Sequence, residues 1–438
     1  MIVAAAGAIA RLGDLGARAR TMLLLWGAAH VAYIAASWWV LRRRGQAPAL
    51  PIILGVGLLA RVLLIPAAPT LSEDVYRYLW DGRLVAHGVN PYPHAPSDPA
   101  LQHFHDPLIR RLNHAGVPTI YPPAAQLLFG AVALVAATPA AWKLLLLALE
   151  FGLILALLRM LERRGMPRER LLLYYWNPLV LVESFGSGHL DLAAAAFLVV
   201  ALALYEGNRR ARAGILFALA VLTKYVPALL IPWLVRRRAW ALLGAAALAT
   251  ALLAAPFLQA GAALTTGLRI YARHWEFNGA AYHVLRECMH SEIAIRRILA
   301  AAGLLVSIVI AWRARSATGA AYACLASFLV LSPTVFPWYV VPVVALLPLH
   351  PDWGMIAFSG LIALSYLPLP AYRSSGLWTL PSWVLWVEYG GLFAIWTAAA
   401  AGAWAGRGRA TASGSRAGVD EREHAHVEKA EEVEKEER

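Results

Sequence analysis

The sequence predicts an all-α fold: a polytopic transmembrane helical bundle of about 11–13 membrane segments, with a large first outer loop that contains interfacial helices. Composition is the first observation, because 60% of the 438 residues are hydrophobic, only 15% are charged, and the mean hydropathy is +0.58. The second is a series of apolar segments that approach the roughly 20 residues needed to cross a bilayer. The third is that arginines gather in short clusters between these segments. Together they exclude a soluble globular protein.

The apolar segments divide nearly the whole chain into candidate spans. They lie near residues 21–41, 49–67, 121–138, 140–161, 171–187, 189–206, 213–235, 239–257, 292–312, 318–332, 337–350, 353–370 and 382–404. We therefore assign residues 1–406 to one transmembrane domain, with a first outer loop at 68–120 and a second at 258–290. Residues 407–438 are rich in Glu and Lys and are expected to form a charged cytoplasmic tail.

Basic residues predict the orientation in the plasma membrane, because lysine and arginine favour cytoplasmic loops. The clusters expected on that side are Arg42–Arg44, Arg163–Arg170, Arg209–Arg212, Arg236–Arg238 and Arg313–Arg315. The two long polar loops then face outward, which places the chemistry on the extracytoplasmic side. Nucleic acid is not an expected partner, since no soluble basic and aromatic module is present.

Two segments do not fit a simple series of crossings. Residues 213–235 have basic clusters at both ends and Lys224 in the middle, which predicts two half-helices that meet at Lys224. A break at membrane depth is tolerated only where it lines a protein or water cavity. Residues 121–138 must also fail to cross fully if Arg163–Arg170 is cytoplasmic, and the N-terminus would then lie outside despite Arg11.

The first outer loop carries the densest set of candidate functional residues. Ser72 can cap a helix that holds Glu73 and Asp74 in its first turn and stops at Gly88. The substrate-binding candidates on this helix are Arg77, Tyr78, Asp81 and Arg83, and Asp74, Tyr78 and Asp81 share one face. One of the two acids is a candidate general base or metal ligand. The structural alternative is an interfacial helix with internal ion pairs.

A second set lies deeper in the expected bundle. A Gly-Ser-Gly turn holds His189 and Asp191 at its outer edge, with Glu183 two turns below; the alternative is a tight turn between helices. Lys224 needs an anionic partner within its apolar run. A substrate phosphate and an internal carboxylate both meet that need.

The second outer loop mixes aromatic and basic side chains. Arg273, Trp275 and Asn278 suit an anionic, sugar-bearing lipid, whereas an interfacial aromatic belt with snorkelling arginines is the alternative. Two prolines in the segment from Ser332 to Tyr339 indicate a structural loop, with its aromatic rings as candidate lipid contacts.

Several classes of chemistry lack their motifs. The sequence has no Walker A lysine motif, no dinucleotide-binding glycine pattern, no HExxH and no Gly-x-Ser-x-Gly elbow. Cys288 and Cys324 show no metal-ligand spacing and are expected to be inert thiols. Nucleotide-driven transport and soluble-cofactor chemistry are therefore disfavoured. Cationic and acidic residues on the outer side instead indicate a phosphate-bearing substrate.

The chain resembles membrane glycosyltransferases of the C superfamily, the GT-C fold, in the mannosyltransferase-like branch that uses polyprenyl-phosphate sugars. The resemblance covers about residues 50–345 and rests on SEDVYRYLWDGRLVAHGVNPYPHAPSDP, PTIYPPAAQLLFG, YYWNPLVLVESFGSGHLD, LAVLTKYVPALLIPWL, RHWEFNGAAYHVLR and SPTVFPWYVV. It implies an acid in the first outer loop as catalytic base. Asp74 matches that acid best, and adjacent Glu73 leaves the choice open. Lys224 matches a position implied to contact the donor phosphate, and Asp191 a second acidic position.

The implied reaction is transfer of a hexose, with mannose expected, from a polyprenyl-phosphate donor to an extracytoplasmic hydroxyl on a glycan, glycolipid or protein. Asp74 would take the proton as the hydroxyl attacks, with inversion. Lys224 with one or more of Arg77, Arg83 and Arg273 would stabilise the leaving phosphate. The superfamily allows a divalent metal on Asp74 and Asp191, which the spacing does not prove. A secondary transporter or flippase of lipid-linked sugars is the alternative, disfavoured by the lack of an internal repeat.

Overall fold

A computed structural model describes residues 1–42 and 49–402, and over these ranges the chain is helical, with two isolated bridges at Thr334 as its only β pairing. The expected all-α polytopic class is confirmed. The charged tail predicted at 407–438 and part of the Arg42–Arg44 cluster lie outside the described residues.

Six helices of the described ranges are long and apolar enough to cross a membrane. They are Ala19–Arg42, Pro139–Arg163, Trp240–His274, Glu292–Arg313, Trp353–Ser375 and Ser382–Gly402. The pair Pro178–Gly186 and Asp191–Glu206 makes a seventh if its 117° bend is counted within one span. Other segments predicted as spans are shorter apolar helices: Leu50–Leu64, Pro123–Val135, Val226–Arg236 and Ala317–Leu331. The 11–13 expected segments thus include helices too short to cross by themselves.

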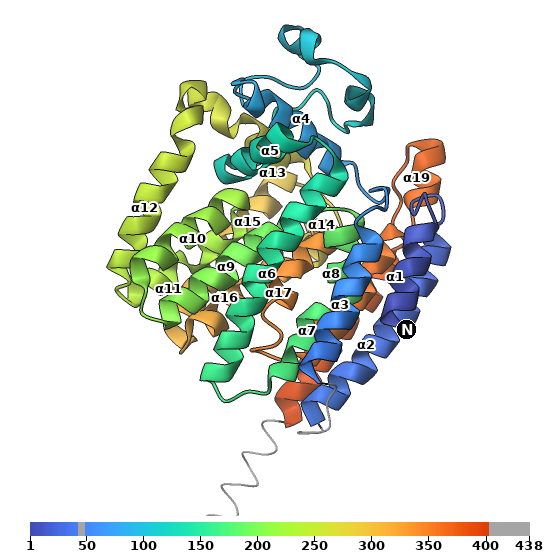
Figure 1. The fold of residues 1–438 in the computed structure, drawn as a ribbon, viewed down its shortest axis with the longest axis vertical. Helices are drawn as coiled ribbons and strands as arrows, with labels where there is room; N and C mark the ends of the chain where they lie inside the picture. The colour runs from blue at the N-terminus through green and yellow to red at the C-terminus, as the bar shows by residue number, and fades with distance from the viewer. Residues whose placement is uncertain (43–48, 403–438) are drawn as a thin grey trace, which may run out of the picture.

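Figure 1 shows the elements in chain order. Before the outer loop come α1 (Ile2–Arg11), α2 (Ala19–Arg42) and α3 (Leu50–Leu64). The loop contains α4 (Asp74–Ala86), η1 (Pro99–Phe104) and η2 (Pro107–Arg111). The central helices are α5 (Pro123–Val135), α6 (Pro139–Arg163), η3 (Arg168–Leu171), α7 (Leu172–Tyr175), α8 (Pro178–Val180), η4 (Leu181–Gly186), α9 (Asp191–Glu206), α10 (Arg210–Thr223), η5 (Val226–Leu230) and α11 (Ile231–Arg236).

The second half of the chain continues the bundle. Its elements are α12 (Trp240–Ala254), η6 (Ala255–Thr265), α13 (Thr266–His274), α14 (Ala280–Cys288), α15 (Glu292–Arg313), α16 (Ala317–Leu331), η7 (Pro337–Val340), α17 (Val341–Val344), α18 (Trp353–Leu361), η8 (Ile362–Tyr366), α19 (Leu369–Ser375), α20 (Ser382–Leu385) and η9 (Trp386–Gly390). In Figure 1, α4 and its loop lie at one end of the bundle, and the basic connection from α6 to α7 lies at the other.

Helix α4 forms much as its sequence predicts. Ser72 Oγ accepts a hydrogen bond from the Asp74 N–H at 3.2 Å, and Glu73 takes the N-cap position. The helix ends at Ala86, and Gly88 follows with φ +74°, a left-handed conformation that glycine adopts without strain. On its inner side α4 packs closely against α5, because a Cβ at Gly82 would collide with the Phe129 backbone.

The predicted break at Lys224 is present. Helix α10 ends at Thr223, Lys224 is extended with φ −153° and ψ 128°, and η5 begins at Val226. Helix α5, predicted not to cross fully, has 13 residues. At about 1.5 Å per residue it spans about 20 Å, less than the roughly 30 Å of bilayer hydrocarbon.

A buried ion pair joins α3 to α6. Arg61 donates to Glu150 through Nε and Nη2, both at 2.6 Å, and Tyr174 donates to the same carboxylate at 2.6 Å. The Tyr175 ring lies 3.7 Å from the guanidinium. Because neither charged side chain reaches solvent, these hydrogen bonds replace the lost hydration and hold the two helices in register.

Candidate active site

A cavity of about 840 Å³ lies where the first outer loop meets the second half of the bundle. Its polar end is lined by Glu73, Asp74, Arg77, Lys224 and Trp275. Sequence analysis singled out all five. The first three lie within residues 73–77, whereas Lys224 and Trp275 lie about 150 and about 200 residues further along the chain. The fold therefore brings together candidates from both outer loops and from the broken helix.

Asp74 is in the first turn of α4, and its side chain is 24% exposed. Burial raises the pKa of this carboxyl to about 6; the positive charge of Lys224 opposes the shift, whereas Glu73 and Asp191 add to it. A carboxyl with a pKa near the working pH is suited to accept a proton, because it is ionised yet still basic.

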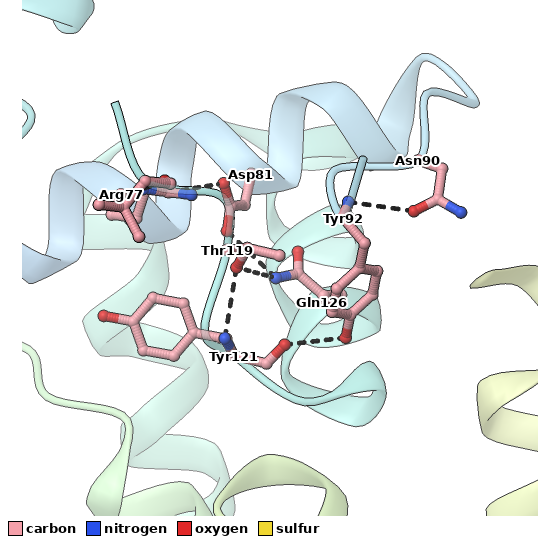
Figure 2. Close-up of polar contacts among 8 residues, drawn as sticks. Arg77, Asp81, Asn90, Tyr92, Thr119, Tyr121 and Gln126 are labelled. Atoms are coloured by element: carbon pink, nitrogen blue, oxygen red, sulfur yellow. Dashed lines mark hydrogen bonds and ion pairs between the residues drawn. The ribbon is translucent and has the colours of Figure 1, made fainter. Parts of the chain in front are cut away.

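Arg77 is held at the cavity by the network in Figure 2. Its Nε donates to Asp81 at 2.8 Å and its Nη1 donates to the Val117 carbonyl at 3.0 Å. Gln126 donates to Asp81 at 3.1 Å and to Thr119 Oγ1 at 2.8 Å. Asp81 is buried away from the cavity lining, so its contacts orient Arg77. The Nη2 of Arg77 is buried and has no hydrogen-bond partner in the described structure.

The same figure shows how this network extends along the loop that follows α4. Tyr121 N–H donates to Thr119 Oγ1 at 3.3 Å, and Tyr92 Oη donates to the Tyr121 carbonyl at 2.8 Å. Tyr92 N–H donates to Asn90 Oδ1 at 3.2 Å. The cavity wall around Tyr121 is thus tied to the chain just beyond the C-terminus of α4.

Lys224 has an internal partner. Its Nζ donates to Asp191 Oδ1 at 2.5 Å and lies 3.5 Å from the centroid of the Tyr339 ring. Asp191 is buried, but the lysine side chain is 19% exposed and lines the cavity. The carboxylate therefore satisfies the need for an anion within the fold, and the ammonium still reaches the cavity surface.

His189 lies beside Asp74, at the bend between η4 and α9. Its Nδ1 is 4.0 Å from Asp74 Oδ2, and its Nε2 is 3.4 Å from Glu183 Oε2. The ring stacks on Trp338, with centroids 3.7 Å apart and an interplanar angle of 11°. His189 and Asp191 are not part of the cavity lining; they contact residues that are.

The remaining sequence candidates lie elsewhere. Tyr78 is buried, with its ring stacked on Phe129 at 4.6 Å. Arg83 pairs with Asp106 of the outer loop at 2.7 Å. Arg273 is exposed at the end of α13, and Asn278 is buried and donates to Glu388 at 2.7 Å. None of Tyr78, Arg83, Arg273 and Asn278 lines the cavity.

The cavity also has lining residues that sequence analysis did not propose for the site. They include His114, Tyr271, Arg296, Tyr366 and Arg373. Tyr271 shares a 2.6 Å hydrogen bond with Tyr339, one of the aromatic rings that the sequence suggested as a lipid contact. Tyr366 donates to Glu183 at 3.0 Å. No spacing in the sequence signals these residues, because long-range packing alone brings them together.

The site offers a poor ligand set for a resident metal. No group of three or more His, Cys, Asp or Glu side chains is arranged to hold an ion in residues 1–42 and 49–402. In addition, the Oδ1 of Asp191 is already bonded to the Lys224 ammonium. The two aspartates therefore do not fit the metal site that the superfamily resemblance allows, and no step of the reaction is assigned to a metal.

The described fold combines several helices long and apolar enough to cross a membrane with a cavity lined by a carboxylate and an ammonium, which defines a multi-pass membrane protein with a charged cavity. Comparison with known families makes this specific: residues 8–241 match the model of the alpha-(1->6)-mannopyranosyltransferase N-terminal domain. Since the match covers more than half of the chain, this protein belongs to that family. It is a multi-pass membrane glycosyltransferase that transfers mannose. No curated protein matches the chain.

The matched region contains Asp74, His189, Asp191 and Lys224, whereas Trp275 lies beyond it. The wall contributed by α13, α15 and α16 is therefore known from this structure and not from the family match.

Proposed function

We propose that the protein transfers mannose from a polyprenyl-phosphate donor to an acceptor hydroxyl, with Asp74 as general base. The observation that carries this proposal is that Asp74 and Lys224, 150 residues apart along the chain, line the same cavity. A base for the acceptor and a cation for the leaving phosphate are the two groups that this transfer requires.

The chemistry of the cavity walls supports a lipid-linked donor. The lining from α15 and α16 is predominantly apolar, with Arg296 as its charged member; the other lining residues are Leu299, Ala300, Gly303, Leu304, Val306, Ser307, Ile310, Cys324, Ser327, Phe328 and Leu331. An isoprenoid chain is apolar and its phosphate is anionic, so the two halves of the cavity match the two halves of such a donor.

In the proposed reaction the acceptor oxygen attacks the anomeric carbon as the bond from that carbon to the phosphate oxygen breaks. The hydroxyl proton passes to the Asp74 carboxylate, and polyprenyl phosphate leaves. Lys224 and Arg77 stabilise the phosphate charge; among the three arginines that sequence analysis considered, only Arg77 lines the cavity. A single displacement inverts the anomeric centre, so an alpha linkage, as in the family's name, requires a beta-linked donor.

Aromatic residues in the cavity wall suit the sugars. Trp275 lines the cavity and contacts the rings of His114 and Tyr271, with centroids 4.6 and 5.4 Å away. Its carbonyl is fixed by hydrogen bonds from Arg296 at 2.8 Å and Thr334 at 3.0 Å. A platform held in this way can stack on a sugar face. We place this part of the cavity on the extracytoplasmic side of the plasma membrane, as the arginine distribution predicts.

The test is transfer of radiolabelled mannose from polyprenyl-phosphate-mannose to membrane acceptors by the full chain in liposomes. We expect wild-type transfer that Asp74→Asn abolishes and Glu73→Gln, its neighbouring control, largely retains. Activity in Asp74→Asn together with loss in Glu73→Gln would assign the base to Glu73. Absence of transfer by a folded wild type, with movement of the intact lipid across the bilayer, would instead establish a flippase.

A further inference from the structure

The His189 imidazole is a buried polar group beside the cavity that lacks hydrogen bonds to its ring nitrogens in the described structure. The residue is 1% exposed, and neither ring nitrogen has a hydrogen-bond partner in the part of the chain that the structure describes. The large majority of buried side-chain polar atoms in proteins are paired, so a side chain with two unpaired nitrogens needs a specific explanation.

Two carboxylates flank this ring, one beyond each nitrogen. Asp74 Oδ2 is 4.0 Å from Nδ1, and Glu183 Oε2 is 3.4 Å from Nε2. Glu183 is itself fixed, because Tyr366 donates to its other oxygen at 3.0 Å. The imidazole is thus aligned between a buried acid and the carboxylate that the proposed function makes the base.

The backbone and one aromatic ring hold the imidazole in this orientation. The His189 N–H donates to the Glu183 carbonyl at 2.9 Å, and Trp142 Nε1 donates to the preceding Gly188 carbonyl at 2.6 Å. Gly188 has φ +80°, which favours glycine, and Trp338 covers the ring face. The ring has little freedom to move, whereas the partly exposed Asp74 can turn towards it.

We propose that His189 is a positioning residue for Asp74: its Nδ1–H holds the Oδ2 of the base so that Oδ1 faces the acceptor hydroxyl. This inference rests on the proposed role of Asp74. With the proton on Nδ1, the ring donates to the ionised Asp74. Nε2 then donates to Glu183 if the ring is imidazolium, or accepts from Glu183 if that acid carries the proton.

The present separation of 4.0 Å exceeds an N–H···O hydrogen bond by about 1 Å. Catalytic hydrogen bonds are often long before the substrate binds and shorten in the reactive complex. His189 is not part of the cavity lining, so it acts on the reaction through Asp74 rather than by touching the sugar. An orienting group behind a base is a recurrent arrangement in enzymes that activate a hydroxyl.

The test uses two amide substitutions that place a donor at different ring positions. The Asn amide nitrogen lies near the Nδ1 position, facing Asp74, and the Gln amide nitrogen lies near Nε2, facing Glu183. We expect His189→Ala to lower kcat by about 10- to 100-fold with the donor KM within about twofold of wild type. His189→Asn should recover most of this loss, and His189→Gln should not. His30→Ala, at another buried histidine outside the cavity lining, is the matched control for loss of a core imidazole.

Recovery by Gln that equals or exceeds recovery by Asn would overturn the proposal, as would unchanged kcat in His189→Ala. A raised donor KM with normal kcat would make His189 a binding residue, which also overturns it. If none of the three variants accumulates as folded protein, His189 is structural and the proposal fails. Inactive wild type or active Asp74→Asn overturns the proposed function instead, so the two failures are distinguishable.

Discussion

The pairing of Lys224 with Asp191 allows donor binding to be separated from stability. Lys224→Met removes the ammonium but leaves Asp191 as a buried carboxylate without its 2.5 Å partner. Breaking a buried pair in this way costs about 3–5 kcal/mol of unfolding free energy. We expect the lower end, about 3 kcal/mol, because the lysine is 19% exposed and water reaches that side of the pair.

The effect on the substrate is a separate quantity. A hydrogen bond from the ammonium to the donor phosphate is worth about 1.5–3 kcal/mol. Its loss should raise the donor KM by about 10- to 150-fold, at 1.4 kcal/mol for each tenfold change. The double variant Lys224→Met/Asp191→Asn removes the unpaired charge, so it should recover most of the stability while the donor KM stays high.

The assay is the midpoint of thermal unfolding together with donor KM from initial rates of radiolabelled mannose transfer. Lys143→Met is the matched control, because Lys143 is also buried and does not line the cavity, and within residues 1–42 and 49–402 its ammonium donates only to the carbonyls of Ile65 and Ala67. It should lower stability and leave the donor KM unchanged. A donor KM within twofold of wild type in the stable double variant would refute phosphate binding and leave Lys224 as the counterion of Asp191.

Three further outcomes follow from the geometry. Burial raises the pKa of Asp74 to about 6, and a general base works in its ionised form. We therefore expect kcat/KM to fall about tenfold per pH unit below pH 6. A value of kcat/KM that stays constant down to about pH 5 would contradict this role of Asp74. Arg61→Met should cost about 3–5 kcal/mol of unfolding free energy, measured as a lower unfolding midpoint, because the buried Glu150 carboxylate loses its counterion. The double change with Glu150→Gln should recover part of this loss, and an unchanged midpoint in the single variant would show that the ion pair does not stabilise the packing of α3 against α6. Gly82→Val should destabilise by about 1–3 kcal/mol or more, because its side chain meets the Phe129 backbone; a wild-type midpoint would show that α4 and α5 can separate without cost.

Local chemistry in the sequence predicts much of the helical framework. The carboxylates at the start of α4 and the glycine after it mark its ends within a residue or two. The basic clusters on both sides of Lys224 likewise predict a broken helix, because a charge within an apolar run requires a cavity or a partner. Such signals depend on neighbours along the chain and on the membrane as solvent, so a single sequence contains them.

The partners of the charged groups depend on the tertiary structure. The sequence leaves open whether Lys224 meets a phosphate or a carboxylate, and only the fold shows Asp191 at hydrogen-bond distance, from 33 residues away. It also suggests Asn278 as a contact for an anionic, sugar-bearing lipid, whereas the fold pairs that side chain with Glu388, 110 residues further on. Spacing cannot distinguish these outcomes.

What the sequence by itself determined is the class: an all-helical membrane protein, the positions of its polar interruptions, and the outer loop that carries Asp74. Only the tertiary structure decided which of the polar segments come together, that Asp81 holds Arg77 in place by a hydrogen bond, and where His189 lies relative to Asp74. The physical reason is the distance along the chain over which each interaction acts. Helix formation and membrane insertion depend on short stretches of chain, whereas a cavity is made by side chains from distant helices, whose packing angles no local pattern specifies.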